Sequence, residues 1–168
     1  MKKIAILVAA STFCLNVFAA EVTEKEAKEY FWNKVVDSIQ TEAPDYFELF
    51  SKDAKIHYTF PKSYEMENGE VKLSDFKETQ EEFWNYTENH SFDLEEPVVK
   101  TEGDKAVVST TFYERYTMEG YTLANEAKHK YTLAKVDGKL KIVEFNNVIT
   151  DLTEQEYEEK KEAKAVKK

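Results

Sequence analysis

The sequence predicts an α+β fold in which N-terminal helices pack in the concave face of a strongly curved antiparallel sheet. Apolar residues recur at helical spacing in the first half, and from Phe92 onward they alternate with a period of two. Gly103, Gly120 and Gly138 divide this second half into long segments with turn-like residues between them. Strands of about a dozen residues twist strongly, so the helices and the sheet should enclose a cone that is open at one end.

The first 19 residues have the pattern of a cleavable export signal. Lys2 and Lys3 form a positive start, residues 4–17 form an apolar stretch, and residues 17–19 form a cleavage site of the small-residue type. We therefore expect a bacterial protein in the periplasm or outside the cell, with cleavage near Ala19. The single cysteine lies within this signal, so the mature chain should lack disulfides, catalytic thiolates and cysteine metal sites.

Charge and length exclude several classes of function. Cleavage after residue 19 removes two lysines and leaves 21 basic and 33 acidic residues, a net charge of −12. This acidity argues against nucleic acid and membrane surfaces as partners, because both attract basic patches. No later segment has the roughly 20 apolar residues of a membrane-spanning helix. Residues 22–151 suit a single domain with one core.

The first half of this domain is mainly helical. Thr23 to Glu26 matches a capping box, and the apolar residues that follow have helical spacing. Pro44 interrupts this pattern, and Pro61 ends a strand whose alternation places Tyr58 on the inner face. The predicted elements are a helix over 24–40, a short helix over 46–50, a strand over 54–60, a polar loop over 61–72 and a helix over 74–86.

The second half is predicted as a four-strand antiparallel meander over roughly 92–101, 106–118, 121–135 and 139–149. A tight turn at Gly120 pairs residue 118 with residue 121. In that register Tyr116 faces Leu123 and Thr110 faces His129 on a mostly apolar inner face. A slip of one residue would exchange the polar and apolar faces, so the parity of the strand is informative.

A second turn at residues 137–138 sets the register of the last strand. It pairs Tyr131 with Glu144 and His129 with Asn146, and it keeps all four on the inner face. Glu144 would then be diagonal to His129 and within reach of it. A histidine beside a carboxylate can act as a general base at neutral pH, so His129 and Glu144 are the candidate catalytic residues.

The other candidates form the wall of the cone, and an aromatic core or a hydrogen-bonded polar cluster is the structural alternative for them. No cofactor is expected, because no glycine-rich phosphate loop is present, and no metal site is expected from three scattered histidines. The predicted pocket-lining residues are Tyr58, Trp84, Thr110, Phe112, Tyr116, Tyr131 and Asn146.

Four further polar residues receive structural interpretations. His57 has the parity opposite to that of Tyr58, which favours the surface or a dimer contact. His90 lies in a predicted polar loop and carries no functional signal. Glu114 and Asn125 should lie near the open end of the cone as rim residues. The tail, residues 153–168, is rich in glutamate and lysine, which is typical of a solvated helical extension or of disorder.

The order of elements resembles the nuclear transport factor 2-like (NTF2-like) superfamily, especially its SnoaL-like members. The resemblance covers nearly all of residues 22–151, and its motifs are fold motifs rather than chemical ones. The superfamily contains isomerases, dehydratases, epoxide hydrolases, cyclases and non-catalytic binding or assembly domains, so the fold alone does not define a reaction. The segments that carry the resemblance are 46–54 (YFELFSKDA), 56–61 (IHYTFP), 74–86, 96–99 (EPVV), 103–108 (GDKAVV) and 137–142 (DGKLKI).

The leading hypothesis is an exported, soluble, non-catalytic module of this fold that binds a small apolar or amphipathic molecule in the cone or a protein through the sheet. The alternative is a small cofactor-independent isomerase, dehydratase or cyclase with His129 as general base. A third possibility is a structural dimer whose cone is filled by its own side chains. Members of the superfamily often pair through the sheet, so a homodimer is expected in all three cases. The Asp–Arg–Asp set of the epoxide hydrolases is not matched, because the single arginine, Arg115, should face outward.

Overall fold

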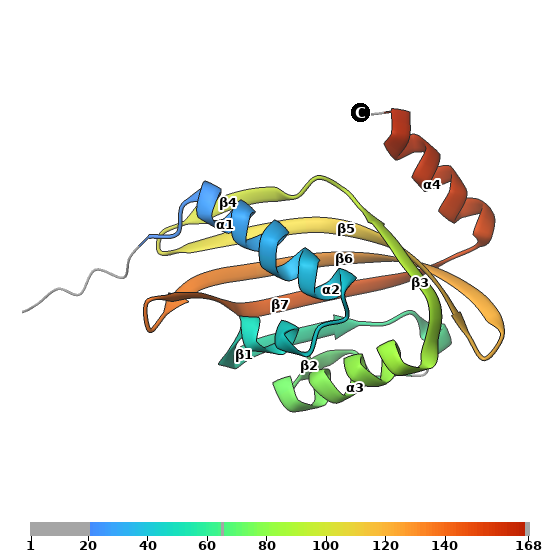
Figure 1. Ribbon diagram of the computed structural model, residues 1–168, viewed down its shortest axis with the longest axis horizontal. Helices are drawn as coiled ribbons and strands as arrows, with labels where there is room; N and C mark the ends of the chain where they lie inside the picture. Colours follow the sequence, from blue (N-terminus) through green and yellow to red (C-terminus); the bar gives the residue numbers. More distant parts are fainter. Residues whose placement is uncertain (1–20, 65, 167–168) are drawn as a thin grey trace, which may run out of the picture.

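The computed structural model describes residues 21–64 and 66–166, so the predicted export signal lies outside the described residues. A sheet of seven strands is combined with helices that come before, between and after its strands in the chain. Figure 1 shows how they are arranged. The helices are α1 (Glu24–Tyr30), a π-helical segment (Phe31–Val36), α2 (Asp37–Gln40), α3 (Leu73–Tyr86), α4 (Glu154–Val166) and 3₁₀ turns at Pro44–Leu49 and Lys62–Tyr64. The strands are β1 (Phe50–Thr59), β2 (Gly69–Val71), β3 (Thr87–Leu94), β4 (Val98–Glu102), β5 (Lys105–Met118), β6 (Tyr121–Val136) and β7 (Lys139–Leu152).

The N-terminal helix begins at the predicted capping box. The Thr23 hydroxyl accepts a hydrogen bond from the Glu26 backbone N–H at 3.2 Å, and the Glu26 carboxylate accepts one from the Thr23 N–H at 3.0 Å. These bonds satisfy two backbone donors that the first turn leaves free. The helical path then continues to Gln40, which confirms the predicted helix over 24–40, and its buried residues Ala27 and Phe31 face the sheet.

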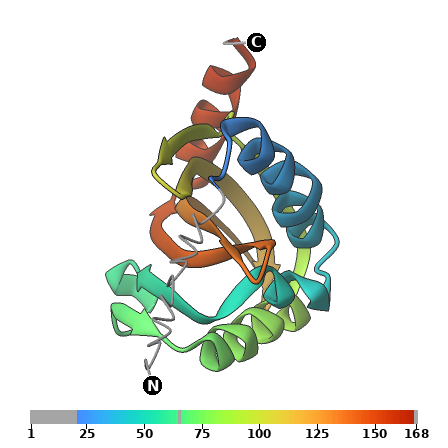
Figure 2. The same ribbon diagram turned by 90° about the vertical axis from the view of Figure 1, so that its left-hand side faces the viewer.

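The sheet confirms the predicted fold class and extends the predicted meander. Its strand order is β2-β1-β7-β6-β5-β3, and β4 also pairs with β5. β1 runs parallel to β7, whereas the other pairs are antiparallel. The predicted strand over 92–101 is in fact two strands, β3 and β4, separated near Pro97, which cannot donate a backbone hydrogen bond. Figures 1 and 2 show the sheet curving around α1, α2 and α3.

The hairpin between β5 and β6 has the predicted register. Tyr116 pairs with Leu123 and Thr110 pairs with His129. The tight turn is built by Glu119 and Gly120, whose φ angles are 51° and 82°. Two residues with positive φ are characteristic of the type I′ turn that joins strongly twisted strands.

The hairpin between β6 and β7 departs from the prediction at one residue. Leu133 pairs with Ile142 as predicted, but the register then shifts, and Tyr131 pairs with Phe145 instead of Glu144. The shift is a β-bulge that leaves residue 143 as an extra residue in β7. Because side chains alternate along a strand, one extra residue moves every later side chain of β7 to the other face.

The bulge overturns the predicted inward positions of Glu144 and Asn146. Phe145 and Asn147 face inward in their place, and His129 pairs with Asn147. Phe145 is 1% exposed, and burial of such a side chain contributes about 1.5–3 kcal/mol, whereas an unpaired carboxylate in the same place would be costly. On the outer face the Asn146 amide donates a hydrogen bond to the Glu144 carboxylate at 3.0 Å.

The C-terminal helix α4 packs on the outer face of the sheet. It begins with a second capping box, in which the Thr153 N–H donates to the Glu156 carboxylate at 2.8 Å. Tyr157 is 3% exposed and packs against Tyr113 and Ala124. Ion pairs of Lys160 with Glu126 and of Lys164 with Asp93 extend this contact. Among the helices of the described residues, none has an apolar stretch long enough to cross a membrane.

Candidate ligand-binding site

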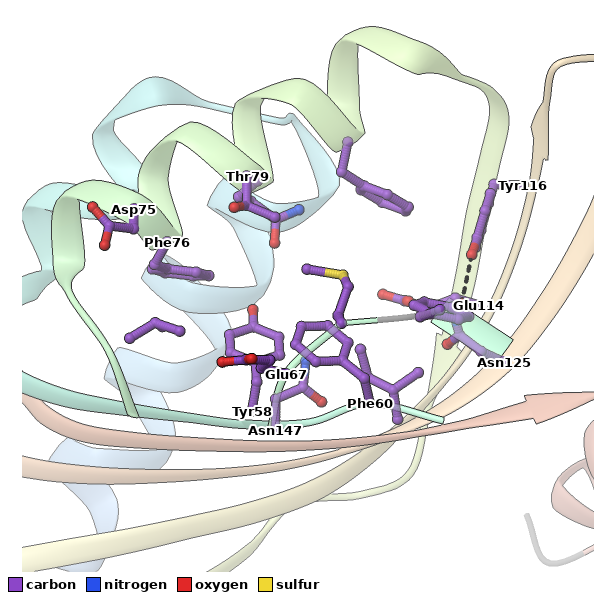
Figure 3. Close-up of a pocket in the computed structure, with 16 residues that line it drawn as sticks. Tyr58, Phe60, Glu67, Asp75, Phe76, Thr79, Glu114, Tyr116, Asn125 and Asn147 are labelled. Atoms are coloured by element: carbon purple, nitrogen blue, oxygen red, sulfur yellow. Dashed lines mark hydrogen bonds between the residues drawn. The ribbon is translucent and has the colours of Figure 1, made fainter. Parts of the chain in front are cut away.

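A cavity of about 220 Å³ lies between α3 and the open end of the concave face (Figure 3). Its residues come from α3, four strands and the segment between β1 and α3. The cavity is lined by Tyr58, Phe60, Tyr64, Met66, Glu67, Val71, Asp75, Phe76, Thr79, Gln80, Phe83, Glu114, Tyr116, Asn125, Asn147 and Ile149.

Aromatic rings form most of the wall because helix and strand periodicities bring them to one side. Phe76 and Phe83 are seven residues apart and therefore share a face of α3. Tyr58 stacks on Phe60 with ring centroids 4.9 Å apart, and it also contacts Phe76 at 5.9 Å. Phe83 meets the Tyr116 ring edge-on at 5.0 Å. These rings hold one another in place around the cavity.

Polar groups from β5, β6 and β7 reach the cavity from the sheet. Glu114 and Asn125 are directly paired across β5 and β6, and Asn147 lies on β7. Asn125 is 3% exposed and Asn147 is 6% exposed, yet the side-chain oxygen of each is buried without a hydrogen-bond partner. An unsatisfied buried oxygen costs about 1–3 kcal/mol. Both of these oxygens therefore lie beside the cavity as hydrogen-bond acceptors without a partner among the described side chains.

The carboxyl group of Glu114 lies between the cavity and a buried histidine. Burial raises the pKa of Glu114, while His90 and the Asn125 side chain act in the opposite direction. His90 Nε2 lies 4.0 Å from Glu114 Oε1, and His90 Nδ1 lies 3.2 Å from Glu42 Oε1. His90 therefore stands between two carboxyl groups.

The prediction that His90 lies in a loop is wrong. His90 belongs to β3, and its imidazole is 8% exposed. The ring packs edge-on against Phe83 at 5.3 Å and lies 6.2 Å from the Tyr116 ring. The polar sequence around it concealed this position, because the strand is recognised only through its pairing with β5.

Three tyrosines supply neutral hydroxyl groups to the cavity. The hydroxyls of Tyr64 and Tyr116 are 3.0 Å apart and hydrogen-bonded at the mouth, which the dashed line in Figure 3 marks. Burial raises the pKa values of Tyr58, Tyr64 and Tyr116 above the usual value of a phenol. All three therefore remain protonated at neutral pH.

His129 is in a different environment from the one predicted. Its Nδ1 lies 2.9 Å from the Tyr131 hydroxyl, and its ring packs between Phe112 at 4.5 Å and Phe145 at 5.1 Å. Burial lowers its pKa to about 3, so the imidazole is neutral at physiological pH. The predicted pairing with Glu144 does not form, because the bulge turns Glu144 to the outer face.

A second, smaller cavity of about 30 Å³ adjoins the first and has room for about one water molecule or two. His129, His90 and Trp84 line it, and the indole N–H of Trp84 is buried without a partner. Glu114 and Asn147 line both cavities. Glu114 and Asn147 therefore form part of the boundary between the two cavities.

The predicted pocket residues therefore separate into three groups. Tyr58 and Tyr116 line the larger cavity, and Trp84 and His129 line the smaller one. Asn146 and Glu144 lie on the outer face. The remaining three are buried in the packed part of the concave face, where the Thr110 hydroxyl donates to the Glu95 carbonyl at 2.7 Å; they are Thr110, Phe112 and Tyr131.

The larger cavity has an acidic character. Glu67, Asp75 and Glu114 are among its lining residues, whereas no lysine, arginine or histidine is among them. Within residues 21–64 and 66–166 no cluster of three or more histidine, aspartate or glutamate side chains is arranged to hold a metal ion.

Comparison with known proteins supports the fold. No family profile and no curated protein matches the sequence. The structure is similar to an NTF2-like protein from Cytophaga hutchinsonii, at 13% identity and a TM-score of 0.59, over 77% of this chain and 100% of that one. It is also similar to a scytalone dehydratase-like protein from Novosphingobium aromaticivorans, at 15% identity and a TM-score of 0.59, over 77% of this chain and 87% of that one. An NTF2-like protein of unknown function in nutrient uptake from Rhodospirillum rubrum matches at 14% identity and a TM-score of 0.57, over 72% of this chain and 96% of that one.

These likenesses and the strand order define the class of the molecule. The chain has the NTF2-like fold, also described as cystatin-like in some of its neighbours, as the sequence resemblance implied. The neighbours include proteins with and without an assigned reaction, so the function has to be argued from the cavity itself.

Proposed function

We propose that the mature protein is an exported binding protein that holds a small amphipathic molecule in the cavity between α3 and the sheet. The observation that carries this proposal is the pair of buried, unpartnered oxygens of Asn125 and Asn147 within an aromatic wall. Buried polar groups without a hydrogen-bond partner are uncommon in a closely packed core, and here two of them lie beside one cavity. A ligand with an apolar body and hydrogen-bond donors satisfies both features.

The size of the cavity limits the ligand. A volume of about 220 Å³ is larger than the roughly 150 Å³ that accommodates benzene, and smaller than the roughly 300 Å³ or more of pockets for drug-sized molecules. The ligand should therefore be of one ring or comparable size with a short polar substituent.

Native mass spectrometry of the protein purified from its own host without refolding tests this function. The expected result is a reproducible small-molecule adduct. Ile149→Trp should fill the cavity and abolish the adduct, because Ile149 lines it. Val148→Trp is the matched control, since Val148 is the neighbouring residue of β7 and is 41% exposed. An adduct that survives in Ile149→Trp would show that the ligand binds elsewhere, and a clean apo mass together with no binding of small probes would reject the function.

Export is a separate part of the proposal and rests on the sequence of residues 1–19. The intact mass of protein recovered from the host should correspond to a chain that begins near Ala20. A full-length mass in a cytoplasmic fraction would contradict export without affecting the binding proposal.

A cofactor-independent acid–base enzyme is the second candidate function, and a specific observation favours it. Glu114 has a raised pKa, faces the cavity and lies 4.0 Å from His90. A carboxyl group of this kind suits proton transfer better than His129, whose low pKa makes it a weak base. Under this alternative, Glu114→Gln would abolish turnover of the identified ligand, whereas His129→Leu would retain most of it once folded.

The pairing of two copies through the sheet stays a prediction. Any such dimer has to accommodate α4, because Tyr157 of that helix covers Tyr113 and Ala124 on the outer face. Analytical ultracentrifugation of the mature chain measures the oligomeric state directly, and a monomer at micromolar concentration would reject the pairing.

A further inference from the structure

We infer that the ligand is a small organic cation, namely an amine carried on a compact apolar body. This inference rests on the proposed function, since it names the chemical class of ligand for the same cavity. Three features of the site support it: the sign of the charges, the direction of the unpaired hydrogen-bonding groups and the aromatic wall.

The charges that face the cavity are of one sign. Glu67, Asp75 and Glu114 line it, and the basic side chains of the described residues lie outside its wall. His90 lines the smaller cavity, where it faces Glu114 and also Glu42. An anionic ligand would meet three acidic groups, whereas an ammonium group would be attracted by them.

The unpaired polar atoms of the site are acceptors. The Asn125 and Asn147 side-chain oxygens accept hydrogen bonds and have no partner, and a Glu114 carboxylate would also be an acceptor. An ammonium group has several donors and no acceptor, so one such group matches this set. A hydrogen bond to a charged group contributes about 1.5–3 kcal/mol, more than a neutral one.

The aromatic wall is compatible with the same chemistry. Tyr58, Phe76, Phe83 and Tyr116 all line the cavity. Aromatic faces attract cations and also bury the apolar part of an amine. The ligand would therefore place its ammonium group toward Glu114, Asn125 and Asn147 and its apolar body against the rings.

Three probes of nearly equal size and different charge test the inference by isothermal titration calorimetry at pH 7. They are 2-phenylethylamine (a cation), 2-phenylethanol (neutral) and phenylacetate (an anion). We expect the amine to bind at least roughly 10-fold more tightly than the alcohol, because a charge-assisted contact replaces a neutral one. Phenylacetate should bind most weakly or not at all.

Two substitutions assign the preference to the proposed groups. Glu114→Gln should reduce the affinity for the amine by roughly 10- to 100-fold and leave the affinity for the alcohol within about 3-fold. Asn147→Ala should lower the affinity for both the amine and the alcohol, because it removes one hydrogen-bond acceptor from the cavity. Glu126→Gln is the matched control, since Glu126 follows Asn125 in β6 but lies on the outer face and pairs with Lys160.

Each outcome separates this inference from the function on which it rests. Equal or tighter binding of the alcohol or of phenylacetate would overturn the cationic ligand while leaving a binding pocket in place. An equal loss of amine affinity in Glu114→Gln and Glu126→Gln would also overturn it, because the preference would then come from the overall charge. If none of the three probes binds and no adduct is found in protein from the host, the binding function itself fails.

Discussion

The concave face has two ends that the same strands build in different ways. Along the first part of β5 the inward residues are almost completely buried, and Val108 and Phe112 are both 0% exposed. Further along the same strand the inward residues are Glu114 and Tyr116, and both line the cavity. Inward and outward side chains alternate along the whole of β5. The change from core to pocket therefore comes from the helices and segments that cover each part of the strand.

The two ends are covered by different elements. The packed end lies under the N-terminal helical segment, where Phe31 contacts Tyr131 with ring centroids 5.7 Å apart. The pocket end lies under α3 and the segment that precedes it, and these leave a space between Phe83 and the sheet. The packed end is closely filled by aromatic and aliphatic side chains, whereas the pocket end combines aromatic rings with buried polar atoms around a cavity, which is why the proposed binding site lies there.

The two histidines show the same difference. His129, at the packed end, is held by the Tyr131 hydroxyl and by the Phe112 and Phe145 rings. His90, at the pocket end, lies between Glu42 and Glu114. Sequence spacing singled out His129, yet His90 is the histidine that lies beside carboxyl groups in the structure.

The largest expected effect compares a ring from each end. Phe112→Ala should lower the free energy of unfolding by about 3–5 kcal/mol, because it leaves a cavity in a closely packed region. Phe83→Ala should cost clearly less, about 1–2 kcal/mol, since one side of Phe83 already faces open volume. Urea unfolding followed by tryptophan fluorescence measures both. Equal losses would show that the pocket end is packed as tightly as the core.

The second prediction concerns how the stability contributed by His129, at the packed end, depends on pH. The folded-state pKa of His129 is about 3, below the value of about 6.5 in an unfolded chain. Between pH 6.5 and pH 3 the unfolded chain therefore binds a proton at His129 that the folded protein does not bind. The contribution of the neutral imidazole to stability is present above pH 6.5 and is lost as the pH falls toward 3. His129→Leu should become more stable relative to wild type across this window, by on the order of a few kcal/mol at its lower end.

Unfolding curves of wild type and His129→Leu at pH 7 and pH 4.5 measure that difference. Comparing the two proteins at each pH cancels the contribution of the many other carboxyl groups. A difference that does not change with pH would mean that His129 is protonated in the folded protein, which contradicts its burial among rings.

The third prediction concerns Glu114 at the pocket end, whose contribution to stability should change with pH in the opposite direction to that of His129. The folded-state pKa of Glu114 is raised, so its protonated form is favoured in the fold. Stability from this group is present below about pH 4.5 and is lost as the pH rises through the folded pKa. Glu114→Gln should therefore be more stable than wild type at pH 7 by roughly 0.5–2 kcal/mol and equal to it near pH 4.

Thermal unfolding of the apo protein at the two pH values tests this expectation. Together with the loss of amine binding, a gain in stability would mark Glu114 as a residue kept for function at the expense of stability. Destabilisation at pH 7 would instead identify a structural ion pair with His90.

The smallest expected effect concerns the hydrogen bond at the mouth of the cavity. Tyr64→Phe removes the bond between the Tyr64 and Tyr116 hydroxyls and should cost about 1 kcal/mol or less. The rings remain, so the affinity for 2-phenylethanol should change little. A loss of several kcal/mol would show that the mouth is part of the core, and the distinction between the two ends would fail.

The parts of the fold that depend on neighbouring residues were predictable. The capping box at Thr23, the helix over 24–40 and the β5–β6 register all rest on side chains or turns a few residues apart. The second capping box at Thr153 has the same sequence pattern, and Tyr157 is the one large apolar side chain in its helix. These two signals identify the start of α4 and its contact with the sheet, although the composition of the tail obscured them.

The candidate site was predictable only in part. Alternation along the strands predicted the inward positions of Tyr58 and Tyr116, and helical spacing predicted that of Trp84. Glu114 and Asn125, predicted as rim residues near the open end, also line the cavity. His90 required the pairing of β3 with β5, and Asn147 required the bulge in β7.

The sequence by itself determined the local elements, their order and the parity of the strands, because these follow from propensity, capping and alternation over short distances. Tertiary structure alone decided which face β7 presents after residue 142, since a single bulge exchanges Phe145 for Glu144. It also decided which polar groups meet around the cavity, because Glu114, Asn125 and Asn147 come from three strands and acquire their shared environment only when the sheet curves under α3.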